Sequence, residues 1–408
     1  MDYPQMQLPI EIVEKIMFYM DSATLLNASK TCKTWNQISK RFLSDNNWWE
    51  KSCKIEFNLY EILTVINNLT TEFDWNFIRN CIIRWDNINQ WKIRTSKHFP
   101  VVSNNEFVSS RILLDKNVFV VRFSYVYFTE TELSHYELCT NSIVYAINDL
   151  IIDLSGRIID TTYGRCQLMY PPYEIHRNCA AIDYREEKII FYASSCVFCL
   201  NLKYIQEEMK KETPRLLRSK LLQCIAKNYT SGLILAISYW NSRILLLNNY
   251  GVLLTVNENI LIKKDTYDFS KYNVEHVFLY CDIVFVITAE GSIVIYHSTN
   301  HREYPNVGQI LSSHPNLIYL HGNLLFLGLC NGNVLIYHCK NIMDINFENY
   351  NHKIKTEPCL VHIEVKEKYE YLHVLLTTTN CVYELQIQDK DLSPNMLKSE
   401  EEEEEEDA

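Results

Sequence analysis

The chain has 408 residues, of which 47% are hydrophobic and 22% charged, and its formal net charge is −11. This apolar content excludes a wholly disordered protein, and the length fits one large domain together with a smaller one. Only nine residues are glycine, which excludes glycine-rich phosphate-binding loops.

Most of the negative charge lies in one run, residues 400–407, in which eight consecutive residues are acidic. Repulsion between like charges keeps such a run extended, so we predict a disordered acidic tail over residues 389–408. The rest of the chain is close to neutral. We therefore expect no nucleic-acid partner.

The 14 cysteines show no repeated spacing. Cys196 and Cys199 form a CxxC pattern inside an apolar run, where strand alternation would send them to opposite faces, so we interpret them as buried free thiols. We expect no metal site and no cofactor. No apolar run approaches the roughly 18 residues of a membrane span, so we expect no membrane association and a reducing compartment, the cytoplasm or nucleus.

The first 53 residues have helical periodicity. Pro9 suits a first helical turn, and Ile12, Ile16 and Met20 follow at one apolar residue per turn. Asp21 and Ser22 can cap a second helix. These signals predict a small helical domain.

The same residues, taken in order, resemble the F-box. The family pattern runs Leu-Pro-x-Glu, an apolar helix, a Leu-Asp turn, a Leu-Leu step, Val-Cys-x-x-Trp and a tryptophan before a closing helix. This chain departs from it slightly, with Met20 in place of leucine and Thr31 in place of valine. The matching residues are Leu8, Pro9, Glu11, Ile12, Ile16, Asp21, Leu25, Leu26, Cys32, Trp35 and Trp48.

The resemblance implies a partner. F-box domains bind the Skp adaptor, which joins them to a cullin and a RING subunit in a ubiquitin ligase. Trp35 can be either a core or a contact residue. The positions that match the adaptor-binding part of the motif are Leu8, Pro9, Ile12, Ile16, Leu25, Leu26, Cys32, Lys33 and Trp35.

Residues 54–98 are predicted to form a helical linker. Thr71 and Asp74 have the spacing of a capping box, and apolar residues follow at helical offsets from Trp75 to Trp85. The linker loosely resembles those of F-box proteins that carry propellers.

Residues 99–388 are dominated by short apolar runs separated by polar turns, which is typical of strands. Two similar hairpins centre on Gly291 and Gly332, 41 residues apart, and a third centres on Gly251, 40 residues before Gly291. Weaker copies flank residues 124–125, 155–156, 194–195 and 380.

A hairpin repeated roughly every 40 residues indicates a β-propeller blade. We predict an all-β propeller of six or seven blades, with seven favoured, and a two-sheet sandwich would not explain the constant spacing. The repeats resemble WD repeats, with Tyr296-His297 and Tyr337-His338 where Trp-Asp would stand. We expect residues 99–102 to close the ring by joining the last blade, and residues 203–218 to form a short helix or a surface loop.

Motifs of hydrolases and nucleotide-binding enzymes are absent from the sequence, so we do not expect an enzyme. A propeller would bind its partner on one face, where loops of several blades meet. A possible patch for that face is Arg157, Arg165, Arg177 and Arg185, which can equally be scattered surface charge.

The pattern as a whole indicates a multidomain substrate receptor of a Skp–cullin–F-box ubiquitin ligase. Its helical domain would bind the adaptor and its propeller would bind a target protein. The alternative is a propeller scaffold that does not drive degradation.

Overall fold

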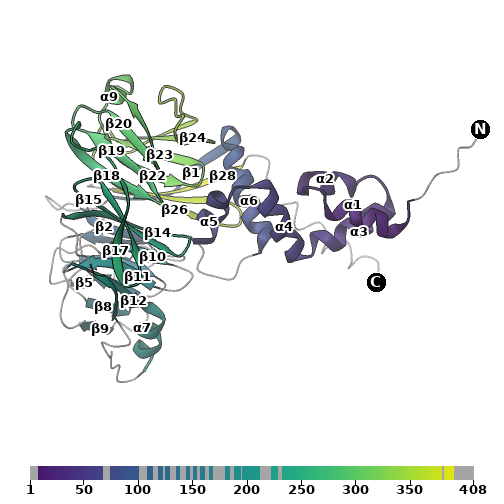
Figure 1. The fold of residues 1–408 in the computed structure, drawn as a ribbon, viewed down its shortest axis with the longest axis horizontal. Helices are drawn as coiled ribbons and strands as arrows, with labels where there is room; N and C mark the ends of the chain where they lie inside the picture. Colours follow the sequence, from purple (N-terminus) through teal and green to yellow (C-terminus); the bar gives the residue numbers. More distant parts are fainter. Residues whose placement is uncertain are drawn as a thin grey trace, which may run out of the picture. The chain divides into compact units, whose positions relative to one another are not determined.

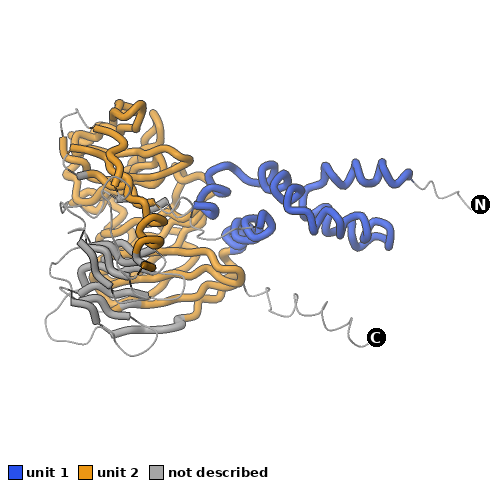
Figure 2. The backbone as a smooth tube through the Cα atoms, turned by 90° about the horizontal axis from the view of Figure 1, so that it is seen from below, with its two compact units in different colours: residues 1–87 blue, residues 88–408 orange. Residues whose placement is uncertain are grey.

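A computed structural model divides the chain into two compact units, Met1–Asn87 and Ile88–Ala408 (Figure 2). It describes residues 8–67, 74–100, 108–113, 118–122, 125–128, 135–137, 144–147, 150–153, 157–160, 165–168, 180–183, 188–193, 195–211, 222–227, 232–378 and 381–389, and between residues 95 and 180 it describes only the course of the backbone. Residues 390–408 of the predicted acidic tail lie outside these ranges, and its first residue, Asp389, ends a strand instead. Within them, no helix is both long and apolar enough to cross a membrane.

The first unit is helical, as predicted. Asp21 caps its second helix by accepting a hydrogen bond from the Thr24 N–H, at 2.6 Å. The helices are α1 (Ile10–Phe18), α2 (Ser22–Ala28), α3 (Lys33–Leu43), α4 (Asn46–Glu56), α5 (Leu59–Asn67) and α6 (Trp75–Asp86).

The cap of α6 differs from the predicted capping box. Asp74 is itself the N-cap and accepts a hydrogen bond from the Phe77 N–H at 2.5 Å, so it does not serve as the acidic third residue after Thr71. Thr71 lies outside the described residues. A carboxylate beside the first turn satisfies an otherwise unpaired N–H whichever residue supplies it.

The predicted division between residues 53 and 54 falls inside α4, which packs against α6. The predicted helical linker also ends early, because β1 (Trp91–Pro100) begins seven residues before residue 98. In β1, Trp91 and Ile93 are buried or half-buried and alternate with exposed Lys92 and Arg94. This period of two belongs to a strand.

The second unit contains antiparallel sheets of four strands (Figure 1). The one larger sheet, of eight strands, joins two such sets through a single parallel bridge between Lys227 and Ile260. Seven four-stranded blades result, as favoured from the sequence.

Six blades follow one another along the chain from inner to outer strand. Their strands are β2 (Val108–Leu113), β3 (Val118–Arg122), β4 (Tyr125–Phe128) and β5 (His135–Glu137); β6 (Val144–Ile147), β7 (Leu150–Asp153), β8 (Arg157–Asp160) and β9 (Arg165–Leu168); β10 (Ala180–Asp183), β11 (Lys188–Ala193), β12 (Cys196–Asn201) and β13 (Leu222–Lys227); β14 (Ile234–Trp240), β15 (Arg243–Asn248), β16 (Val252–Asn257) and β17 (Ile260–Thr266); β18 (Val274–Tyr280), β19 (Ile283–Thr288), β20 (Ile293–His297) and β21 (Asn300–Tyr304); and β22 (Pro315–His321), β23 (Leu324–Leu329), β24 (Asn333–His338) and β25 (His352–Lys355).

The seventh blade closes the ring. It takes β26 (Leu360–Glu367), β27 (Leu372–Thr378) and β28 (Cys381–Asp389) from the end of the chain and β1 as its outer strand. Phe99 pairs with Val382 and Pro100 with Cys381, which confirms the predicted closing segment for these two residues. The first strands of neighbouring blades contact one another in five pairs, β2 with β6, β10 with β14, β14 with β18, β18 with β22 and β22 with β26, and β2 contacts β27 of the last blade. This succession of sheets forms a propeller.

Every hairpin predicted from the repeat is the second and third strand of one blade. Short helical segments are η1 (Ile88–Gln90), just before β1, α7 (Leu202–Met209), between β12 and β13, and α9 (Val307–Ile310), between β21 and β22. The helix α7 confirms the helical alternative for residues 203–209 of the insertion, and residues 212–218 lie outside the described residues.

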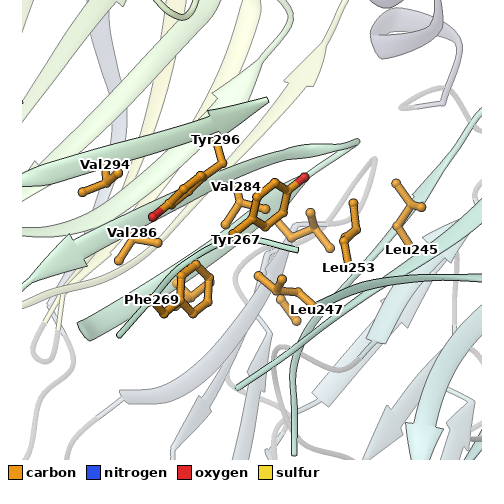
Figure 3. Packing of buried hydrophobic residues seen from close by; sticks show 12 residues of the cluster. Leu245, Leu247, Leu253, Tyr267, Phe269, Val284, Val286, Val294 and Tyr296 are labelled. Atoms are coloured by element: carbon orange, nitrogen blue, oxygen red, sulfur yellow. The ribbon is translucent and has the colours of Figure 1, made fainter. Parts of the chain in front are cut away.

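Two tyrosines that the sequence pattern aligns with the tryptophan of WD repeats, Tyr296 and Tyr337, are both buried. Tyr296 is buried with Tyr267, Phe269 and residues of β15 and β19 in a cluster that joins the fourth and fifth blades (Figure 3). Its hydroxyl donates a hydrogen bond to the Asp268 carbonyl at 3.0 Å, and that of Tyr337 donates to the Phe347 carbonyl at 3.1 Å. Each tyrosine therefore fills an apolar gap and satisfies its own hydroxyl.

The turn glycines provide a stability test. Gly332 has φ +83°, and a Cβ there would lie 2.5 Å from the carbonyl oxygens of Thr356 and Glu357. We expect Gly332→Ala to lower the free energy of unfolding by about 3 kcal/mol, because backbone strain and a backbone clash add. Urea unfolding of the full chain measures this.

Gly308 is the matched control, because its φ is not in the left-handed region and a Cβ would meet its nearest neighbours at 3.5 Å. Gly308→Ala should leave the urea midpoint unchanged. Equal midpoints for the two variants would contradict the turn geometry.

Candidate binding surface

The first helix has apolar side chains on two faces. Val13 and Met17 face the core, at 4% and 0% exposure, whereas Ile12 and Ile16 are 44% and 39% exposed. Ile12 and Ile16 are four residues apart and lie on one side of the helix. The exposed Leu8 precedes the helix by two residues, and the exposed Tyr19 is its C-cap. We call these four residues the α1 stripe. A small domain that leaves such a stripe uncovered usually buries it against a partner.

The core behind the stripe holds it in place. Val13, Met17 and Leu25 pack with Trp48 and Trp49 of α4, and Trp35 packs against this cluster from its edge. Leu25 has no exposed surface, while its neighbour Leu26 is 38% exposed. The Leu-Leu step therefore supplies one residue to the core and the next to the surface.

The predicted adaptor-binding residues thus fall into two groups. Leu25 is buried and Trp35 is half-buried, so both support the surface from behind. The exposed members are Leu8, Pro9, Ile12, Ile16, Leu26, Cys32 and Lys33.

Sequence reasoning missed the aromatic end of α1. Phe18 and Tyr19 are 40% and 71% exposed, and the Lys51 ammonium lies 3.2 Å and 4.4 Å from their ring centroids. Lys51 also donates a hydrogen bond to the Phe18 carbonyl at 3.2 Å. The signal was available in the sequence, because residues 10–20 carry more apolar side chains than one buried helix face can use.

A polar network ties the helices of this unit together. The Glu56 carboxylate accepts hydrogen bonds from the Ser22 N–H at 2.8 Å, from the Ser22 hydroxyl at 2.9 Å and from the Ser52 hydroxyl. Arg79 donates to the Ser22 hydroxyl and lies 3.6 Å from Glu56. Residues of α4 and α6 thereby cap the start of α2.

Burial determines the electrostatics of this network. It lowers the pKa of the Arg79 guanidinium, and the Glu56 carboxylate opposes that effect. Burial also raises the pKa of the neighbouring Cys53 thiol to about 12, so this cysteine stays protonated. Hydrogen bonds from Thr24 lower the pKa of the exposed Asp21 carboxyl at the same helix start.

The predicted arginine patch is only partly described. Arg177 and Arg185 lie outside the described residues, and so do the side chains of Arg157 and Arg165. In the backbone register Arg157 pairs with Leu168 and Arg165 with Asp160, which places the two at opposite ends of the β8–β9 ladder. The arginine patch stays a prediction.

The pair Cys196 and Cys199 lies on β12, and both cysteines are half-buried and outside any disulfide. Strand alternation separates them, as predicted, although neither is fully buried. Over the described residues, no group of three or more His, Cys, Asp or Glu side chains could hold a metal ion.

The comparison with protein families identifies one domain. The F-box domain matches residues 6–47, which include α1, α2 and α3 and the whole α1 stripe. An F-box domain binds a Skp-type adaptor, and proteins that carry one generally act as adaptor or receptor subunits rather than enzymes. No curated protein matches the sequence.

The comparison with solved structures concerns the propeller. The chain is similar to BBS1N, solved in complex with ARL6DN and soaked with mercury, with a TM-score of 0.51, 11% identity and coverage of 74% of this chain and 98% of that one. The same complex soaked with lead gives a TM-score of 0.50, 12% identity and the same coverages. At these identities the likeness supports the fold alone.

The Glu56–Arg79 network lies beyond the matched residues and yields a prediction. Glu56→Gln leaves Arg79 buried beside a neutral amide, so we expect a loss of about 3–5 kcal/mol in the free energy of unfolding of the helical unit. Urea unfolding followed by circular dichroism at 222 nm measures it.

Glu50 offers the matched control, because it pairs with Lys54 on the exposed side of the same helix. Glu50→Gln should cost less than about 0.5 kcal/mol, as surface pairs do. If both substitutions have the same small effect, the network does not stabilise the unit.

Proposed function

We propose that this chain is the substrate receptor of a Skp–cullin–F-box ubiquitin ligase, acting in the cytoplasm or nucleus. The observation that carries the proposal is the uncovered α1 stripe within the segment that matches the F-box domain. The adaptor would cover Leu8, Ile12, Ile16 and Leu26. Through the adaptor, the chain would join a cullin and a RING subunit.

The propeller supports the second half of the proposal. Seven blades present loops at one end of the ring, and converging loops on a rigid frame are a common place to bind another protein. The repeats resemble WD repeats in their hairpin pattern and in the buried tyrosines at the Trp-Asp positions. In this role the chain forms no covalent bond and acts by holding target lysines near activated ubiquitin.

Truncating the exposed stripe should weaken adaptor binding without unfolding the unit. We expect the double variant Ile12→Ala, Ile16→Ala to bind a Skp adaptor at least about 30-fold more weakly, because about 2 kcal/mol of apolar burial is lost. Isothermal titration with purified full-length chain measures the change.

Ile55 provides the control, because it is 69% exposed on α4 and lies outside the F-box match. Ile55→Ala should leave the affinity unchanged, as should removal of residues 400–407. An unchanged affinity of the double variant would contradict the proposed docking face.

A second experiment separates a degradative receptor from a scaffold. The tagged chain is purified from cells treated with a proteasome inhibitor, and co-purifying proteins are identified with the wild type and with the Ile12→Ala, Ile16→Ala variant. If the chain is a receptor, the wild type should co-purify with cullin and RING subunits and the double variant should not. Depletion of the chain from cells should then raise the abundance of at least one bound protein. Adaptor binding without any such rise would favour the scaffold.

A further inference from the structure

A groove lies between the fourth and fifth blades, on the cluster that joins them. It has a volume of about 830 Å³ and is lined by residues from the start of β14, the β15–β16 turn, the loop after β17 and the first half of β18. The chain course places all of these at one end of the blades, the end at which their first strands begin. We call this the entry end.

The floor of the groove is apolar and tightly packed. Tyr267 and Phe269 belong to the buried cluster shared by the two blades (Figure 3). Leu235 and Val274 pack against this cluster. These side chains are held by neighbours on both blades, so the floor is rigid without a ligand.

The rim carries an exposed aromatic side chain on a fixed turn. Tyr250 is 61% exposed, and next to it Gly251 adopts φ +75°. The Gly251 carbonyl accepts a hydrogen bond from the Tyr267 N–H at 2.8 Å, and a Cβ at Gly251 would lie 2.1 Å from the Tyr267 carbonyl oxygen. The turn is therefore pressed against the floor, and Tyr250 is presented to solvent at little entropic cost.

The charge of the lining is negative. Within the described part of the chain, the groove lining has two carboxylates, Asp268 and Glu275, and neither lysine nor arginine. The lining also contains His276, whose Nε2 lies 3.7 Å from the Glu275 carboxylate. Hydrogen bonds from Ser270 fix the Asp268 carboxylate and lower its pKa. His314 holds Glu275 at 2.7 Å.

Neighbouring loops at the entry end extend the negative field. Glu290 follows β19 and Glu357 precedes β26. In the described loops at this end of blades four to seven, the one lysine or arginine is Lys271. Its ammonium lies 3.3 Å from the Asp268 carboxylate. An exposed pair three residues apart contributes little and exchanges readily with another cation. The groove thus offers apolar walls, aromatic faces and carboxylates to a ligand.

We infer that this groove binds an extended peptide segment of a target protein in which a lysine or arginine is flanked by apolar residues. The basic group would pair with Glu275 and Asp268 and lie against the Tyr250 ring, and the flanking apolar side chains would cover Leu235 and Phe269. The inference rests on the proposed function, because it names the class of target that the propeller presents. A patch of arginines, as predicted from the sequence, would instead suit phosphorylated targets.

The test uses hexapeptide libraries with one fixed central residue: arginine, lysine, glutamate or phosphoserine. The full-length chain is captured on immobilised Skp adaptor, and retained peptides are identified by mass spectrometry. Libraries fixed at arginine and lysine should be retained at least about tenfold more than the others, with aromatic or aliphatic residues enriched beside the basic one.

The double variant Asp268→Asn, Glu275→Gln should lose this enrichment while keeping the thermal midpoint of the wild type. Asp282→Asn, on the opposite end of the same blades, is the control and should retain the enrichment. Three outcomes would overturn the groove assignment. They are a preference for glutamate or phosphoserine, no enrichment of any library, and an enrichment of basic peptides that persists in the double variant.

The capture step separates the two proposals. If the chain fails to bind the immobilised adaptor, the proposed ligase role fails, and the chain can be attached through a tag to test the groove alone. If the chain is captured and no basic peptide is retained, only the groove assignment fails.

Discussion

The pairing of β1 with β28 is the constraint on which the large unit depends. Ten residues from before the first blade complete the last one, so the seventh sheet contains both ends of the propeller's sequence. Without this strand the last blade would keep an unpaired edge and the ring would lack its closing contact. The segment that leads into β1 is also anchored. The His352 Nε2–H donates a hydrogen bond to the Ile88 carbonyl oxygen at 2.5 Å, and the His352 ring stacks on Trp91 with 5.9 Å between centroids.

In the helical unit, the binding surface exists because α1 has more apolar side chains than the core of the unit buries. One face of α1 packs on the two adjacent tryptophans of α4, and the other face leaves Ile12 and Ile16 44% and 39% exposed within this unit. The segment that matches the F-box domain does not include most of α4 or any of α6, yet the Glu56 carboxylate and Arg79 cap α2 from those helices. Folding of the docking face therefore depends on residues beyond the recognised motif.

Much of this organisation could be predicted from local sequence. The F-box pattern located α1 to α3, and the spacing of Gly251, Gly291 and Gly332 located the hairpins of three blades, because turn glycines report a local backbone requirement. Other features depend on residues far apart in the chain. Tertiary packing produces the Glu56–Arg79 pair, the start of the closing strand at Trp91 and the groove beside Tyr250. No short-range sequence pattern predicts these features.

The sequence motif also does not show which of the predicted adaptor-binding residues are buried and which are exposed. Leu25 and Leu26 are adjacent and chemically identical, and only the packing of α2 on its neighbours decides that one is buried and the other exposed. Trp35, left open between core and contact, is half-buried at the edge of the core. A motif therefore identifies the residues that matter, and burial assigns their roles.

Hydrogen exchange of the full-length chain, followed by mass spectrometry with and without a Skp adaptor, tests whether the adaptor covers the α1 stripe. We expect slower exchange in residues 8–28, where the α1 stripe and Leu26 become covered, and unchanged exchange in the blades of the propeller. Slower exchange confined to the propeller, or no change in residues 8–28 at saturating adaptor, would contradict this expectation.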